Sequence, residues 1–219
     1  MKRTTILGAI LALGLVLAAC STTPGATAVA SKENAVAAKK IDPDGFHDAV
    51  RKLWEDHVTW TRLYIVSAAA GLPDAQLTAE RLLRNQDDIG NAIKPFYGDE
   101  AGEKLTALLR DHILGAADLI AAAKAGDTAK VGTLKTAWYE NGDAIAAFLS
   151  SANPKNWPLE AVTHHMRMHL DLTLDEAVKR LEGNFAADIA LYDEVHDAIL
   201  QMADIISAGI QAQFPQRFA

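Results

Sequence analysis

The segment that decides the fold is GFHDAVRKLWEDHVTWTRLYIVSAAA, residues 45–70. Its apolar side chains recur every three or four residues, the spacing that places them on one face of an α-helix. That face is formed by Val50, Trp54, His57, Trp60, Tyr64 and Ala68. Asp42 and Pro43 are typical of a helix start, and Gly71 followed by Pro73 is typical of a helix end. The segment therefore predicts a long amphipathic helix with one buried face.

The same periodicity continues to the C-terminus, without the alternating pattern that is typical of β-strands. We expect three more long helices, over residues 99–125, 127–152 and 184–213, and shorter helical pieces over 73–83, 85–93, 159–170 and 173–183. Two breaks are expected, one before Pro95 and one at Thr173-Leu174-Asp175-Glu176, which has the pattern of a capping box. The prediction is an all-α fold, an up-and-down helical bundle of four long helices plus shorter helices. No internal repeat is evident.

The N-terminal 20 residues have the pattern of an export signal. Lys2 and Arg3 precede an apolar run over residues 6–17 that is shorter than the roughly 20 residues of a transmembrane helix. The stretch Leu17-Ala18-Ala19-Cys20 resembles the cleavage site of bacterial lipoproteins. This resemblance implies that residues 1–19 are a signal peptide, and that Cys20 becomes the first residue and carries a lipid.

We therefore expect a protein anchored to a membrane through the lipid on Cys20, on the extracytoplasmic side. Residues 20–40 are rich in Ser, Thr, Ala and Gly and are expected to form a flexible tether, followed by a helical domain of residues 41–219. The residue after the cysteine is Ser21. A residue other than Asp at this position resembles the pattern of lipoproteins sent to the outer membrane. In a cell with two membranes we thus expect the protein at the outer membrane, facing the periplasm.

Charge and cysteine content exclude several functions. The chain has 28 acidic and 21 basic residues and a formal net charge of −7, which becomes −9 once Lys2 and Arg3 are removed. An acidic surface disfavours nucleic acid as a partner. Cys20 is the only cysteine, so a lipidated chain has no thiol for a disulfide or a cysteine-ligated metal. Hydrolase and phosphate-loop motifs are missing, so we predict no catalytic residue and favour a protein that is not an enzyme.

Four histidines lie on or beside the apolar faces of four different predicted helices. They are His57, His112, His169 and His196. The core of a helical bundle collects side chains from facing helices into one site, and imidazole is a common metal ligand. We therefore treat these residues as candidate ligands of copper, iron or zinc. The alternative is that each histidine only packs in the core and makes a hydrogen bond there.

A second candidate metal site is the run His164-His165-Met166-Arg167-Met168-His169. On a helix, His165 and His169 are one turn apart and could bind one ion, and imidazole with thioether suits copper. The alternative is an ordinary amphipathic segment in which methionine fills the core.

Several short stretches resemble a family of small bacterial helical proteins. They are LWEDHVTWTR (53–62), LLRN (82–85), KPFYG (94–98), GN (183–184) and LYD (191–193). The resemblance covers residues 50–215, implies one helical domain and adds no catalytic residue. The combined expectation is a lipid-anchored binding protein with histidine ligands for a transition metal. The alternative is a structural or interaction lipoprotein of the envelope without a metal or ligand site. A small ligand or an envelope protein as partner is left open.

Overall fold

Six α-helices form the part of the chain that the computed structural model describes, residues 40–219. They are α1 (Pro43–Ala70), α2 (Ala75–Tyr97), α3 (Asp99–Lys124), α4 (Thr128–Ala152), α5 (Leu159–Leu181) and α6 (Phe185–Gln213), followed by a short 3-10 helix, Pro215–Arg217. The predicted all-α bundle is confirmed. Cys20, the predicted signal peptide and almost all of the predicted tether lie outside the described residues.

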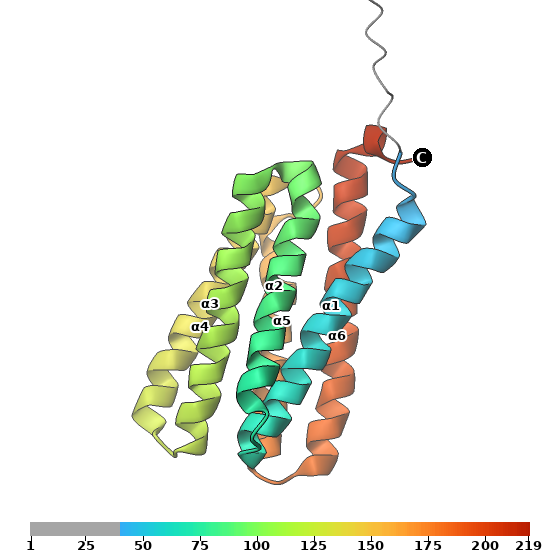
Figure 1. Ribbon diagram of the computed structural model, residues 1–219. Helices are drawn as coiled ribbons and strands as arrows, with labels where there is room; N and C mark the ends of the chain where they lie inside the picture. The colour runs from blue at the N-terminus through green and yellow to red at the C-terminus, as the bar shows by residue number, and fades with distance from the viewer. Residues whose placement is uncertain (1–39) are drawn as a thin grey trace, which may run out of the picture. The chain divides into compact units, whose positions relative to one another are not determined.

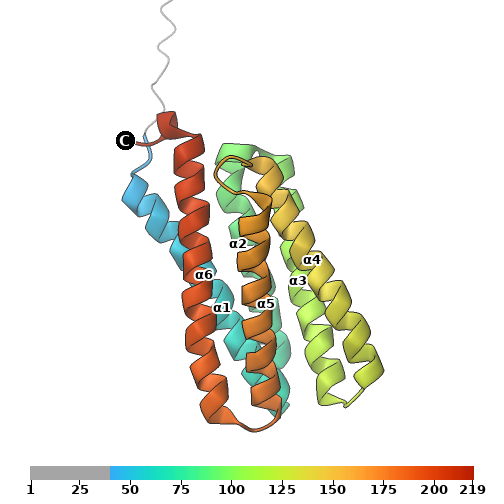
Figure 2. The ribbon, with the colours of Figure 1, turned by 180° about the vertical axis from the view of Figure 1, so that it is seen from behind.

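The helices form a closed ring. Each helix packs against the next one in the chain, and α6 packs against α1. Figure 1 shows α1, α2 and α3 on the near side, and Figure 2 shows α4, α5 and α6 from behind. Because successive helices are antiparallel, α1, α3 and α5 run in the same direction, and these three also contact one another. The centre of the bundle is therefore lined by three parallel helices.

The two expected breaks are wrong, because α2 and α5 are continuous helices of 23 residues each. Pro95 lies in the last turn of α2, where the missing N–H affects only the helix end. Thr173 and Glu176 do not cap a helix. Both side chains are buried, and Glu176 accepts a hydrogen bond from Arg62 of α1. The bundle thus has six long helices, where the sequence pattern predicted four long and several shorter ones.

The structure also reveals a repeat of three helical hairpins, α1–α2, α3–α4 and α5–α6. Gly71, Gly126 and Gly183 follow α1, α3 and α5 with φ angles of 67°, 71° and 75°, a left-handed conformation that glycine adopts without strain. Equivalent positions of α1, α3 and α5 form buried layers between these helices. The layers are Val50, Leu105 and Val162; Trp54, Leu109 and Met166; His57, His112 and His169; and Ile65, Ile120 and Ala177.

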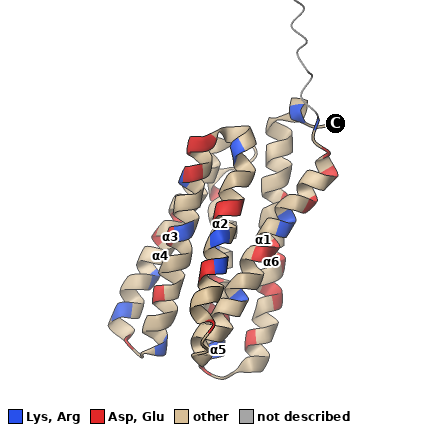
Figure 3. Ribbon diagram, in the orientation of Figure 1, with Lys and Arg blue, Asp and Glu red and all other residues tan. Residues whose placement is uncertain are grey.

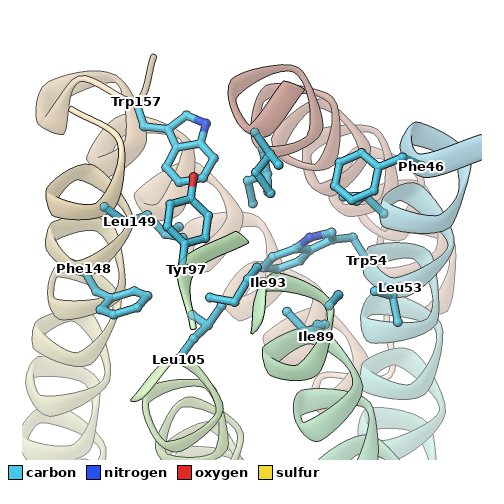
Figure 4. A pocket seen from close by; sticks show the side chains of 15 residues that line it. Phe46, Leu53, Trp54, Ile89, Ile93, Tyr97, Leu105, Phe148, Leu149 and Trp157 are labelled. Carbon is cyan, nitrogen blue, oxygen red and sulfur yellow. The ribbon is translucent and has the colours of Figure 1, made fainter. Parts of the chain in front are cut away.

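One end of the bundle is closed by the loop between α4 and α5. Trp157 of this loop is buried, and its indole Nε1 donates a hydrogen bond to the carbonyl oxygen of Ile205 at 3.0 Å. A Cβ atom on Gly209 would lie 2.0 Å from that Nε1, so only glycine lets the indole approach α6 this closely. Figure 4 shows Trp157 and Tyr97 above an apolar pocket that Trp54 and Leu105 also line.

The outer surface is polar and of mixed charge. Lys, Arg, Asp and Glu alternate along the outward faces of the helices, most visibly on α2 (Figure 3). Within residues 40–219, no helix combines the length and the apolar composition that crossing a membrane requires.

Candidate functional site

Three of the predicted histidines meet at one level in the centre of the bundle. His57, His112 and His169 each precede the glycine that ends their helix by 14 residues, at 71, 126 and 183. At 1.5 Å per residue, each histidine lies about 21 Å from the same end of the bundle. Since α1, α3 and α5 are parallel and in contact, this spacing brings the three imidazoles together.

The three imidazoles are close to one another and buried. The ring centres of His57 and His169 are 5.8 Å apart, and those of His112 and His169 are 6.4 Å apart. None of the three side chains is more than 4 % exposed. The site is therefore a buried cluster with one imidazole from each hairpin.

His112 is held in place by two residues of α4. Its Nδ1 donates a hydrogen bond to Asn141 Oδ1 at 2.9 Å, and its ring stacks on Trp138 with 5.1 Å between the ring centres. Asn141 in turn donates to the carbonyl oxygen of Leu108 at 3.1 Å, which fixes the direction of its amide. Because Asn141 Oδ1 accepts a hydrogen bond from Nδ1–H, the proton of the neutral imidazole stays on Nδ1 and the free lone pair is on Nε2.

The other two histidines are less completely satisfied. Among residues 40–219, Nδ1 of His57 and Nδ1 of His169 are buried and have no hydrogen-bond partner, and the same holds for Oε1 of Gln86. A buried polar atom without a partner costs about 1–3 kcal/mol. Such an atom therefore calls for a specific explanation, such as a bound ion or water.

All three imidazoles are neutral at physiological pH. Burial, and then the proximity of His112, lowers the pKa of His57 to about 3, although the Gln86 side chain opposes this shift. Burial lowers the pKa of His112 to about 4, although the hydrogen bond to Asn141 opposes this shift. Burial, and then His57 and His112, holds the pKa of His169 well below its ordinary value. Each ring thus keeps a lone pair that no proton occupies at neutral pH.

The cluster is close to the geometry of a metal site without having it. Two imidazoles bound to one tetrahedral ion at about 2.0–2.1 Å have ring centres about 5 Å apart, so the separations of 5.8 Å and 6.4 Å found here are somewhat too large. As the side chains lie, however, no group of three or more His, Asp or Glu residues within 40–219 is arranged to hold a metal ion. Metal binding therefore requires the rings to turn about χ2, a torsion that is soft for histidine.

The remaining candidate ligands lie outside this cluster. His196 is on the surface, where its Nε2 is 3.5 Å from Glu55 Oε1. His165 is half-buried, packs against the exposed His164, and has a buried Nδ1 without a partner among the described residues. The predicted cluster at residues 164–169 is divided, because His169 faces the core whereas His164 is exposed.

Two polar residues in the core of α2, Asn85 and Gln86, were not predicted from the sequence. Asn85 and Gln86 of α2 are fully buried, and Asn85 donates to the carbonyl oxygen of Leu53 at 3.0 Å, as Asn141 does to Leu108. A signal for them exists in the shared pattern Asn-x-Asp-x-Ile, at residues 85–89 and 141–145. In the third hairpin, Val195 precedes the corresponding Asp197-Ala198-Ile199, so the asparagine is not repeated.

A second buried polar group links α1, α5 and α6. Arg62 donates hydrogen bonds to both oxygens of Asp188 and to Glu176 Oε1, the last at 2.8 Å. Arg180 Nη1 lies 3.3 Å from Asp188 Oδ2. Burial raises the pKa of Glu176 to about 7, against the opposing effect of Arg62. Two arginines thus face two carboxylates, between the histidine layer and the end of the bundle at which α1 and α5 terminate.

Comparisons of the chain with protein-family models, with curated proteins and with solved structures give no match.

Proposed function

We propose that this protein is a membrane-anchored binding protein whose helical domain holds one transition-metal ion between His57, His112 and His169. The observation that carries the proposal is the meeting of three neutral, buried imidazoles, of which two have an Nδ1 without a hydrogen-bond partner among residues 40–219. The anchor would be the lipid that the lipoprotein-like sequence predicts on Cys20. The site would then lie outside the cytoplasm, as the export signal implies.

The donor set favours copper or zinc. Neutral imidazole suits both ions, and the described part of the chain has no thiolate to compete for them. Asn141 orients His112 as an outer-shell partner commonly orients a metal-ligating histidine, with Nε2 free for the ion. Because the pKa values of His57 and His112 are low, the ion does not compete with protons for these ligands at pH 5–7.

Metal content of the full chain, purified without a His tag, tests the proposal. We expect about one copper or zinc ion per chain and a rise in Tm when the ion is added to protein stripped with a chelator. His169→Leu should abolish both effects, whereas the matched surface variant His196→Leu should retain them.

His169→Leu also separates a ligand from a packing residue. His169 Nδ1 has no hydrogen-bond partner within residues 40–219, so an apolar side chain of similar size should leave the metal-free protein as stable or more stable. A His169→Leu protein that folds and still binds the ion with unchanged affinity would exclude this site. Stripped wild-type protein whose Tm responds to neither copper, iron nor zinc would favour the structural or interaction lipoprotein.

A further inference from the structure

The first two hairpins place an asparagine beside the histidine of each hairpin. In both, the asparagine of the second helix donates to the carbonyl oxygen that lies four residues before the histidine. Asn141 of α4 donates to Leu108 at 3.1 Å, and Asn85 of α2 donates to Leu53 at 3.0 Å. The two asparagines therefore hold equivalent positions next to the histidine layer.

The residue after each asparagine makes the two hairpins different. Gly142 follows Asn141 and has no side chain that could compete for the amide oxygen, and Asn141 Oδ1 accepts from His112 Nδ1 at 2.9 Å. Gln86 follows Asn85, and its Nε2 donates to Asn85 Oδ1 at 3.1 Å. The asparagine oxygen that serves the histidine of the second hairpin is thus occupied in the first hairpin.

Gln86 brings an oxygen of its own to the first histidine. Its side chain is fully buried, and its Nε2 makes a second hydrogen bond, to the carbonyl oxygen of Leu82 at 2.8 Å. Both partners of Nε2 are acceptors, which fixes the orientation of the amide. Gln86 also raises the pKa of His57 against the effect of burial, as an acceptor does and a donor does not. Oε1 is therefore the atom of Gln86 that faces the imidazole.

We propose that Gln86 positions His57 for the metal by accepting a hydrogen bond from His57 Nδ1–H at Oε1. This inference rests on the proposed metal site. As the side chains lie, neither Gln86 Oε1 nor His57 Nδ1 has a partner among residues 40–219, although one is an acceptor and the other can carry a proton. A turn of the His57 ring about χ2, the motion that metal binding also requires, joins the two atoms and removes the cost of leaving both unpaired.

This hydrogen bond fixes the tautomer of His57. With its proton on Nδ1, the imidazole has its free lone pair on Nε2, the arrangement that Asn141 gives to His112. The third hairpin has Val195 at the position of the asparagine and lacks this arrangement. Two of the three imidazoles are thus set to bind through Nε2 before the ion arrives.

Long-range ¹H–¹⁵N NMR of the full, metal-free chain at pH 7 reads the tautomer of each histidine. We expect the Nδ1–H tautomer at both His57 and His112 in the wild type. Asn85→Ala serves as the background for the substitution, because Asn85 Oδ1 could otherwise replace Gln86 as the acceptor. Asn85→Ala alone should keep the Nδ1–H tautomer of His57. Adding Gln86→Leu, which removes the acceptor and keeps a side chain of similar size, should move the proton to Nε2 and leave His112 unchanged.

Metal affinity gives the second readout. Loss of an outer-shell partner typically weakens metal binding by about 10–100-fold. Asn85→Ala with Gln86→Leu should therefore bind copper or zinc at least about tenfold more weakly than Asn85→Ala alone. Gln76→Leu, on the exposed face of the same helix, should change neither the tautomer nor the affinity.

The outcomes distinguish the two proposals. A wild-type His57 with its proton on Nε2, or a His57 tautomer that is the same in the single and the double variant, would overturn the role of Gln86 and leave the metal site standing. The expected tautomers in a chain that binds neither copper nor zinc would confirm the hydrogen bond and overturn the metal site.

Discussion

Acidification should destabilise the metal-free bundle through its buried histidines. The pKa of His57 is about 3 and that of His112 about 4 in the folded protein, against 6.5 in the unfolded chain. Between those values the unfolded chain binds more protons, so the free energy of unfolding falls as the pH falls. From pH 7 to pH 5, each of the two residues should lower it by about 2 kcal/mol. His169 shifts in the same direction and adds to the loss.

Glu176 opposes this loss of stability on acidification. Its carboxyl group must therefore be removed before the contribution of the histidines can be measured clearly. Its pKa is about 7 in the folded protein, above the value of 4.5 for the unfolded chain. Its contribution to stability is therefore fully present below pH 4.5 and is lost as the pH rises through 7. Between pH 7 and pH 5 it should raise the free energy of unfolding by about 2 kcal/mol, roughly half the loss from His57 and His112.

Urea unfolding at pH 7 and pH 5, followed by circular dichroism with a chelator present, measures both effects. Glu176→Gln should lose at least about 4 kcal/mol on acidification, and wild type about 2 kcal/mol less than the variant. Adding His112→Gln to the Glu176→Gln background should reduce the loss by about 2 kcal/mol. A Glu176→Gln protein with the same free energy of unfolding at both pH values would refute the account of buried neutral imidazoles.

Two further substitutions test the packing and the buried charges. Gly209→Ala places a Cβ atom 2.0 Å from Trp157 Nε1 and should destabilise the protein by about 1–3 kcal/mol. Its control, Gly132→Ala, meets nothing within 4 Å on an exposed helix and should raise Tm instead; equal effects would contradict the close contact. Arg62→Met leaves Glu176 and Asp188 without their main donor and should cost about 3–5 kcal/mol at pH 7. In urea unfolding the cost should be smaller at pH 5, where Glu176 is protonated; a cost independent of pH would count against this pairing.

Local sequence patterns were sufficient to predict that the chain forms helices, but not to predict which helices continue without a break. The periodicity of α1 and the glycines after α1, α3 and α5 are short-range signals, and they predicted these helix ends to within two residues. Pro95 and the Thr173–Glu176 pattern are also local signals, and both misled. Their outcome depends on distant partners, since Glu176 accepts from Arg62 across 114 positions of sequence. Tertiary contacts therefore determined whether α2 and α5 are continuous, because the local preference at these positions was weak.

The candidate site could be predicted in part. The apolar faces placed His57, His112 and His169 in the core, but their relative height was not evident without the spacing to the glycines. His196 was expected on or beside an apolar face and is half-buried, beside Glu55 and away from the other three histidines. Buried atoms without a hydrogen-bond partner among residues 40–219, such as His169 Nδ1 and Thr173 Oγ1, cannot be recognised in a sequence, because the lack of a partner is a property of the packed bundle.

The first and last residues of the described segment, 40–219, meet in a short parallel bridge between Ile41 and Phe218. The Ile41 N–H donates to the Arg217 carbonyl at 2.9 Å, and the Ala219 N–H donates to the Ile41 carbonyl at 3.1 Å. A helical domain whose first and last residues touch can be fused there and opened elsewhere. Because the three hairpins occupy equivalent places in the ring, a circular permutant that begins at Asp99 keeps every helix pair and every histidine intact. In such a permutant the helices keep their places in the ring, but α3 and α4 are synthesised first. Circular permutation could therefore select which hairpin is synthesised first.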